Sequence, residues 1–250
     1  MLLPGERLEP LSRDISVIAS RGHSFNTDTI LLAAFCAPRN GEVCADFGTG
    51  CGAIPLLWYT KAKPKMVYAV EIQENACDMA RRSVEYNHLT SQIEILNEDI
   101  KTLKNAAVPD HLDLIACNPP YKTDGAGLQN PNEEMRIARH EVACSFGDIV
   151  QAATALLRFG GRFCCCLRPE RLCSAMMELR AVGLEPKRLR FVQHRPSNAP
   201  SLFLLQAKRG GKPGMTVDPV LFIKDASGGY TEEMIQIYGE YAKNKGAVVK

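Results

Sequence analysis

Apolar runs of four to seven residues alternate along this chain with longer segments of helical periodicity. The runs predict strands at Val43–Phe47, Met66–Ile72, Ile93–Leu96, Leu112–Cys117, Gly161–Leu167, Arg188–Gln193 and Leu202–Ala207. The other segments predict helices at Asp28–Cys36, Ala53–Tyr59, Glu74–Tyr86, Asp148–Arg158, Glu170–Ala181 and Glu232–Tyr241. This alternation favours βαβ units, and therefore a mostly parallel seven-stranded sheet. Ligands of such α/β sheets bind beyond the carboxyl ends of the strands, so we expect the functional residues to lie there.

The composition is that of an ordinary globular protein, with 46% hydrophobic and 23% charged residues among 250. The longest apolar run, Ile30–Ala37, is far shorter than the ~20 residues of a membrane-spanning helix. Pro4, Glu6 and Glu9 interrupt the first ten residues, which therefore do not resemble a secretory signal. We expect a cytoplasmic protein that does not enter a membrane.

Ten cysteines are present, and no two of them have the CxxC spacing that is typical of zinc and redox sites. Most of them lie within strand or helix patterns. We therefore expect small buried side chains in a reducing compartment, and no metal site.

Charge is distributed unevenly along the chain. Residues 1–120 carry 11 basic and 15 acidic residues, whereas residues 121–250 carry 19 and 13. The segment 158–212 has 12 basic and 3 acidic residues, a net charge of +9. This asymmetry favours an anionic macromolecule as a partner, with a solvated basic face as the alternative. The Gly-, Pro- and Lys-rich stretch Ala207–Pro219 suggests that the sheet ends there.

The first predicted strand leads into a glycine-rich turn, in the stretch ADFGTGCGAIPLL. Asp46 closes the strand, and Gly48, Gly50 and Gly52 follow before an apolar helix. Alternate glycines allow the backbone to turn sharply and to approach a ligand closely. An acid two residues before the first glycine is a poor neighbour for a pyrophosphate, but it suits an ammonium or sulfonium group. The stretch therefore predicts a cofactor loop rather than a plain tight turn.

Two further acids follow the ends of the next strands. Glu71 lies 25 residues after Asp46, where a carboxylate can accept hydrogen bonds from ribose hydroxyls, although a solvated carboxylate is the alternative. Asp99 lies 28 residues after Glu71 and precedes Ile100. Its carboxylate can accept from an adenine amino group while the isoleucine covers the ring. The alternative role of Asp99 is to cap the turn Ile100–Leu103.

The fourth predicted strand ends in Asn-Pro-Pro-Tyr, residues 118–121. The exocyclic amine of a nucleobase or amide is a poor nucleophile because its lone pair is delocalised, so acceptors must hold its hydrogens. The Asn118 side-chain oxygen and the Pro119 carbonyl can be these acceptors, and tandem prolines, Pro119 and Pro120, fix the backbone. Tyr121 can stack on a planar substrate. A proline-terminated strand with a capping tyrosine is the structural alternative.

Together these strand ends describe a cationic cofactor with a ribose and an adenine, next to a planar amine, which indicates S-adenosylmethionine and a methyl acceptor. The chain resembles the NPPY class of Rossmann-like class I methyltransferases, and in particular the tRNA1(Val) (adenine-37 N6)-methyltransferase family. The resemblance is carried by DFGTGCG, NPPY, GERLEPL, HSFNTDTILLAAF, NPNEEMRIARHE, GRFCCCLRPERL and the tail RGGKPGMTVDPVLFIKDASGGYTEEMIQIYG. It implies a fold with helices on both faces of the sheet. It also implies methyl transfer to N6 of an adenine in tRNA, with A37 of tRNA1(Val) as the expected acceptor.

The resemblance also implies roles for individual residues, and it places Phe25, Asp28 and Thr29 beside the methionine portion of the cofactor. The candidate cofactor residues are Phe25, Asp28, Thr29, Asp46, Gly48, Thr49, Gly50, Gly52, Glu71, Ile72, Asp99, Ile100 and Asn118. The candidate catalytic residues are Asn118, Pro119, Pro120 and Tyr121. We expect one domain, with an N-terminal segment over the cofactor site (1–40), a methyltransferase core (41–209) and a C-terminal extension (210–250).

An RNA acceptor would be held by basic residues. The candidates are Lys122, Arg136, Arg139, His140, Arg168 and Arg195, and a basic track would extend over Arg171, Arg188, Arg190, Lys208, Arg209 and Lys212. A structural network with Glu141 is the alternative role of Arg139 and His140. The same chemistry could serve another RNA adenine or a protein glutamine amide, and a non-catalytic RNA-binding protein is a third hypothesis. We take a monomer as the default state.

Overall fold

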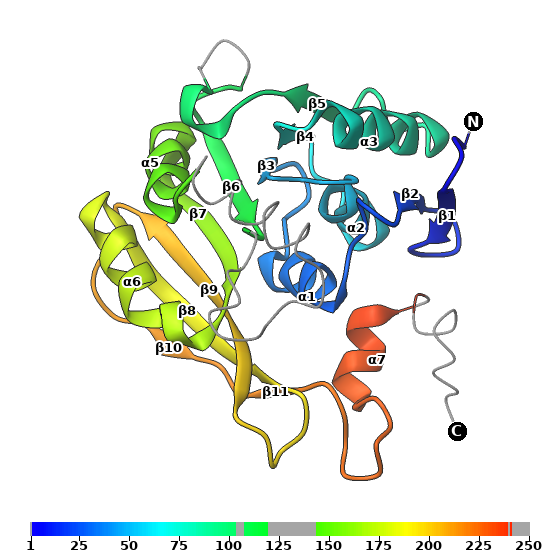
Figure 1. Ribbon diagram of the computed structural model, residues 1–250. Helices are drawn as coiled ribbons and strands as arrows, with labels where there is room; N and C mark the ends of the chain where they lie inside the picture. Colours follow the sequence, from blue (N-terminus) through cyan, green and yellow to red (C-terminus); the bar gives the residue numbers. More distant parts are fainter. Residues whose placement is uncertain (1, 104–107, 120–143, 240, 242–250) are drawn as a thin grey trace.

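The computed structural model describes residues 2–103, 108–119, 144–239 and 241 (Figure 1). Its central sheet has the strand order β10-β8-β9-β7-β6-β3-β4-β5, and β11 also pairs with β8. The strands are β3 Val43–Phe47, β4 Met66–Glu71, β5 Ile93–Asn97, β6 Leu112–Cys117, β7 Leu157–Leu167, β8 Leu184–Gln193, β9 Pro200–Arg209, β10 Thr216–Val217 and β11 Leu221–Phe222. The helices are α1 Thr27–Cys36, α2 Ala53–Lys61, α3 Glu74–Tyr86, α5 Phe146–Leu156, α6 Leu172–Ala181 and α7 Glu232–Tyr238. A hairpin of β1 Glu6–Pro10 and β2 Ser16–Ser20 precedes them.

The prediction of a mostly parallel sheet is confirmed. Strand β9 is antiparallel to β7 and β8, and the other pairs of the sheet are parallel. All seven predicted strands are present, and the described residues add β10 and β11 along the outer edge of β8. The sheet therefore does not end within Ala207–Pro219 as the composition suggests. A two-residue strand is too short to produce an alternating pattern, so the sequence carries no signal for it.

Helices cover both faces of the sheet, as predicted. Helices α1, α2, α3 and α7 share one hydrophobic core, and α5 and α6 share the other. Because side chains alternate along a strand, Cys164 and Cys166 of β7 belong to the first core and Cys165 to the second. Burial raises the pKa of the Cys165 thiol well above its usual value. Eight of the ten cysteines are buried, which confirms their expected role as small hydrophobic side chains.

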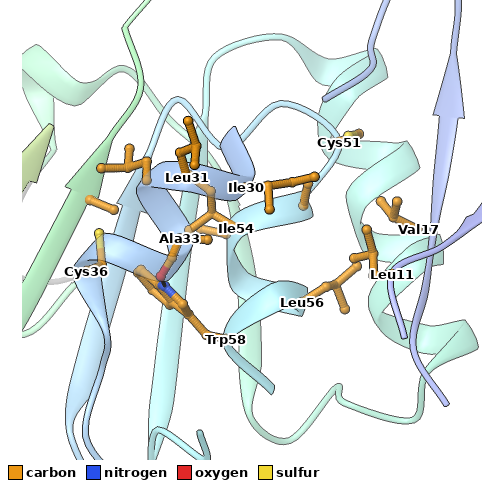
Figure 2. Packing of buried hydrophobic residues seen from close by; sticks show 14 of the residues in the cluster. Leu11, Val17, Ile30, Leu31, Ala33, Cys36, Cys51, Ile54, Leu56 and Trp58 are labelled. Carbon is orange, nitrogen blue, oxygen red and sulfur yellow. Dashed lines mark hydrogen bonds between the residues drawn. The ribbon is translucent and has the colours of Figure 1, made fainter. Parts of the chain in front are cut away.

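The first core is built around α1 and α2 (Figure 2). Trp58, the only tryptophan of the chain, is 2% exposed, and its indole nitrogen donates a hydrogen bond to the Ala33 carbonyl at 3.2 Å. Leu11 and Val17 of the hairpin segment pack on the same cluster. The sequence has no clear signal for this hairpin, because Glu6–Pro10 mixes charged, apolar and proline residues without alternation. The packing fixes α1 against the sheet and thereby positions its first turn.

The start of α5 differs from the prediction that the helix begins at Asp148. Ser145 is the N-cap, and Asp148 completes a capping box with it from the third helical position. The helix ends at Leu156 and β7 begins directly at Leu157, earlier than the predicted Gly161. A register shift in the pairing with β6 accommodates the additional strand residues, at a point where Gly160 has a φ of 78°.

Residues from both ends of the chain contribute to the first core. Val17 and Ile30 precede residue 41, whereas Leu221 and Met234 follow residue 209, and all four are buried in the same cluster. The division into segments 1–40, 41–209 and 210–250 itself stays a prediction. Within the described residues, no helix is both long enough and apolar enough to cross a membrane.

Candidate active site

The glycine-rich turn after β3 adopts a backbone conformation that favours glycine. Gly48, Gly50 and Gly52 have φ values of 74°, 56° and 81°, in the left-handed region that is costly for other residues. A Cβ at Gly52 would lie 3.2 Å from Cβ of Ala80, so this glycine allows α2 to start close to α3. A Cβ at Gly48 or Gly50 would meet nothing within 4 Å. These two glycines therefore present backbone to open space that a ligand can enter.

Asp46 is a buried acid without the partners that usually accompany burial. It is 1% exposed, and within the described ranges neither its carboxylate oxygens nor the Thr49 hydroxyl has a hydrogen-bond partner. Burial, with a smaller contribution from the charge of Glu71, raises the pKa of Asp46 to about 7. The nearby Thr49 hydroxyl lowers the pKa of Asp46 in part, although the geometry between the two groups is not that of a hydrogen bond. An unsatisfied carboxylate beneath a glycine loop suits a cationic ligand.

Glu71 links the glycine loop to the turn that follows β4. One carboxylate oxygen accepts from the Gly50 N–H and the other from the Gln73 N–H, both at 3.0 Å. Each oxygen keeps a second lone pair, so it can still accept from a ligand hydroxyl. Glu71 is therefore more than a solvated carboxylate: it is 6% exposed and holds the shape of the loop.

Asp99 has the capping role that the sequence offered as an alternative, whereas its contact with an adenine stays a prediction. Its side chain accepts from the Lys101 N–H at 2.9 Å and caps the short 3-10 helix η1, Ile100–Thr102. It also lines the same cavity as Glu71. Ile72 and Ile100 line this cavity as well, and Ile72 is 48% exposed. Apolar side chains therefore stand beside both carboxylates, an arrangement that suits a ring with polar edges.

Asn118 and Pro119 follow β6 and lie in the same cavity, close to the first turn of α1. The Asn118 side-chain nitrogen donates to the Thr29 hydroxyl at 3.4 Å, across 89 residues of sequence. Both Asn118 and Pro119 are partly exposed. Pro120 and Tyr121 lie outside the described residues, so the second half of the motif stays a sequence prediction.

The cavity has a volume of about 370 Å³ and brings most of the predicted strand-end residues together. The predicted residues among those that line it are Gly48, Gly50, Glu71, Ile72, Asp99, Ile100, Asn118 and Pro119. Residues that sequence reasoning missed also line it, namely Arg21, Gly22, His23, Ser24, Phe47, Cys51, Gln73, Glu98, Cys117, Cys144 and Ile149. His23 and Ser24 begin the stretch HSFNTDTILLAAF, and Arg21 and Gly22 directly precede it. The family resemblance of that stretch is the only sequence signal for these four residues.

Six predicted cofactor residues are not among the cavity-lining residues: Phe25, Asp28, Thr29, Asp46, Thr49 and Gly52. Phe25 packs against the Tyr241 ring at 5.5 Å between centroids. Burial raises the pKa of Asp28, while the nearby Arg168 guanidinium lowers it. Asp28 and Thr29 belong to the first turn of α1, and the Asn118 contact shows that this turn reaches the cavity wall.

Much of the expected basic track is engaged within the protein. Arg171, Arg188 and Arg190 form ion pairs with Glu178, Asp218 and Glu233, respectively. The Arg168 and Arg209 side chains donate to the carbonyls of Ser201 and Leu157. Arg195 is exposed. The other candidates, Lys122, Arg136, Arg139 and His140, lie outside the described residues.

No group of His, Cys, Asp and Glu that could hold a metal ion occurs among the residues that the structure describes.

Comparison with known proteins supports the interpretation drawn from the motifs. A protein from Tolumonas auensis named tRNA1(Val) (adenine(37)-N6)-methyltransferase is 27% identical over 86% of this chain and 88% of its own length. A protein of the same name from Phocaeicola vulgatus is 28% identical over 87% and 90%. Among solved structures, a predicted O-methyltransferase from Agrobacterium tumefaciens has a TM-score of 0.68 at 21% identity, covering 86% of this chain and 96% of that one.

The predicted class I methyltransferase fold is thus confirmed. The model of the methyltransferase small domain family matches residues 20–179, which include the glycine loop, both strand-end acids and the Asn-Pro-Pro-Tyr motif. Because this match spans more than half of the chain, the protein belongs to the methyltransferase small domain family.

Proposed function

We propose that this protein transfers a methyl group from S-adenosylmethionine to N6 of an adenine in tRNA, with A37 of tRNA1(Val) as the acceptor. The observation that carries the proposal is the shared cavity, in which Asn118 and Pro119 stand with the glycine loop, Glu71 and Asp99. Family membership supports methyl transfer, and the name of the bacterial relatives supports the adenine of a tRNA as acceptor.

The described residues fit S-adenosylmethionine at three points. Asp46 provides an unsatisfied carboxylate for a cationic ligand, and Gly48 and Gly50 leave open space over the loop. Glu71 would accept from the ribose hydroxyls, and Asp99 with its apolar neighbours would hold the adenine. When bound, the cofactor supplies a methyl group on a sulfonium, which is already electrophilic.

The task of the protein is then to prepare the acceptor amine. The Asn118 side-chain oxygen and the Pro119 carbonyl would each accept one N–H of the amine and turn its lone pair toward the methyl group. No strong base is required, because the amine becomes acidic once it is methylated. Tyr121, as the motif predicts, would stack on an adenine that has left its own stack.

The ion pairs of the basic segment bear on how the RNA is held. Since Arg188 and Arg190 already have acidic partners, we expect phosphate contacts to come mainly from other residues, of which the exposed Arg195 is one. The number of phosphate contacts sets how steeply tRNA affinity falls with salt. Measuring the Kd for tRNA at several salt concentrations gives that number directly.

The decisive experiment is methyl transfer from labelled S-adenosylmethionine to tRNA, followed by nucleoside analysis. Wild type should form N6-methyladenosine, whereas Asn118→Ala should lose activity by at least two orders of magnitude and still bind the cofactor. Asn40→Ala is a matched control, because Asn40 is exposed and precedes the amino end of β3. The cavity, in contrast, lies at the carboxyl ends of the strands. A wild-type protein that binds S-adenosylmethionine but methylates only a protein amide would refute the proposed acceptor.

A further inference from the structure

We propose that Thr29 is a positioning residue that fixes the orientation of the Asn118 amide, through a hydrogen-bond relay that starts at Asn26. The inference rests on the proposed function, because it concerns which end of the amide faces the acceptor amine. The family resemblance implies that Thr29 contacts the cofactor. The proposal gives Thr29 a different role, which is to orient the Asn118 side chain. Three hydrogen bonds carry the argument.

The relay starts at the N-cap of α1. The backbone N–H of Thr29 donates to the Asn26 side chain at 3.1 Å. A backbone N–H can only donate, so the Asn26 atom in this contact must be the oxygen, Oδ1. The capping interaction therefore fixes which way the Asn26 amide points.

The hydroxyl of Thr29 passes this orientation on. Thr29 Oγ1 lies 3.2 Å from Asn26 Oδ1 and 3.4 Å from the Asn118 amide. Because it meets an oxygen at Asn26, the hydroxyl donates its single hydrogen there and can only accept from Asn118. The Asn118 atom that faces Thr29 is then the nitrogen, Nδ2. If the amide were flipped, one hydroxyl hydrogen would have to serve two oxygens, and one contact would become repulsive.

The consequence for the reaction is that Asn118 Oδ1 points away from α1. An oxygen in this position can accept a hydrogen from the acceptor amine, whereas a flipped amide would present N–H groups to N–H groups. The support is rigid, because α1 is packed in the first core through buried residues such as Ile30 and Leu31. A capping residue thus orients a catalytic amide that lies 89 residues away from Thr29.

Three threonine variants test the relay by steady-state kinetics. Thr29→Val removes the hydroxyl and keeps the shape, so kcat should fall about tenfold, the rate equivalent of one net hydrogen bond. The KM for tRNA and the Kd for S-adenosylmethionine should stay within about twofold. Thr29→Ser keeps the hydroxyl and should recover most of kcat. Thr27→Val, which removes a hydroxyl bonded to Tyr238 at 2.9 Å in the same helical turn, should lower Tm but leave kcat unchanged.

The outcomes are distinguishable. A Thr29→Val enzyme with wild-type kcat, or a Thr29→Ser enzyme as slow as Thr29→Val, overturns the relay. A loss that lies entirely in the Kd for S-adenosylmethionine also overturns it and makes Thr29 a cofactor contact. If wild type itself forms no N6-methyladenosine in tRNA, the proposed function is what fails.

A second readout does not depend on activity. In protein with ¹⁵N-labelled asparagine, the Asn118 side-chain amide signals can be assigned by their loss in Asn118→Ala. They should shift in Thr29→Val and stay in place in Thr27→Val. Signals that do not respond to Thr29→Val contradict the hydrogen bond, whatever the enzyme methylates.

Discussion

Replacing Asp46 with asparagine should stabilise the cofactor-free protein at pH 8 while weakening cofactor binding. Asp46 is 1% exposed and has no hydrogen-bond partner for either carboxylate oxygen in the described part of the chain. Its pKa rises from 3.8 to about 7, mainly through burial. The unfolded chain releases the proton near pH 4 and the folded chain near pH 7. The stability that protonated Asp46 contributes is therefore present below about pH 4 and is lost as the pH rises to about 7.

The size of the effect follows from this difference of about three pKa units. At about 1.36 kcal/mol per unit, the ionised group destabilises the fold by roughly 4 kcal/mol at pH 8. At pH 5 the pH is only about one unit above the pKa of Asp46 in the unfolded chain. Asp46 then destabilises the fold by roughly 1.5 kcal/mol. Asparagine does not titrate, so the advantage of Asp46→Asn over wild type should grow by roughly 2.5 kcal/mol from pH 5 to pH 8. A buried amide without partners costs about 1–3 kcal/mol, which leaves a net gain of about 1–3 kcal/mol at pH 8.

The assay is urea unfolding of the cofactor-free protein at pH 5, 6, 7 and 8, followed by the fluorescence of Trp58. Asp14→Asn serves as the control, because Asp14 is exposed and its substitution should have the same small effect at every pH. Calorimetric titration should show that Asp46→Asn binds S-adenosylmethionine more weakly than wild type. A stability difference between Asp46→Asn and wild type that is equal at pH 5 and pH 8 would contradict a raised pKa of Asp46 in the folded protein.

Three further substitutions test separate parts of the structure. Gly52→Ala should lower the free energy of unfolding by about 1–2 kcal/mol in urea, because its φ is 81° and its Cβ would lie 3.2 Å from Ala80; an unchanged midpoint would contradict this geometry. Glu71→Gln should weaken cofactor binding about tenfold in calorimetry, because one end of the new amide must face a backbone N–H such as that of Gly50; wild-type affinity would show that the loop does not depend on both oxygens. Arg188→Ala should lower the free energy of unfolding by about 1 kcal/mol, because it removes the ion pair with Asp218 and the contact with the Phe35 ring, and it should leave tRNA affinity unchanged. Weaker tRNA binding at an unchanged Tm would instead show that Arg188 contacts the RNA.

Local sequence patterns were sufficient to predict the central sheet of this protein and the residues at its strand ends. The apolar runs predicted the seven strands β3 to β9 of the central sheet, because a buried strand such as Leu112–Cys117 carries its signal in consecutive residues. The glycines after Asp46 and the acids at the strand ends were predictable for a similar reason. Once the order of parallel strands is known, their carboxyl ends meet at one edge of the sheet. The cavity does bring Gly48, Gly50 and Glu71 together with Asn118.

Partnerships between distant residues had no such signal. Asn118 meets Thr29 across 89 residues, and Arg190 meets Glu233 across 43. Asp46 acquires its raised pKa only when the packed fold removes water from it. Periodicity describes which face of an element is buried, whereas a hydrogen bond or an ion pair depends on how separate elements pack in three dimensions. The type and order of the elements from α1 to α6 are therefore largely determined by local sequence, whereas the β1–β2 hairpin and the strands β10 and β11 are not. The hydrogen bond of the Asn118 amide and the raised pKa of Asp46 arise from tertiary contacts, because a side chain's partners and its access to water exist only once the elements have packed.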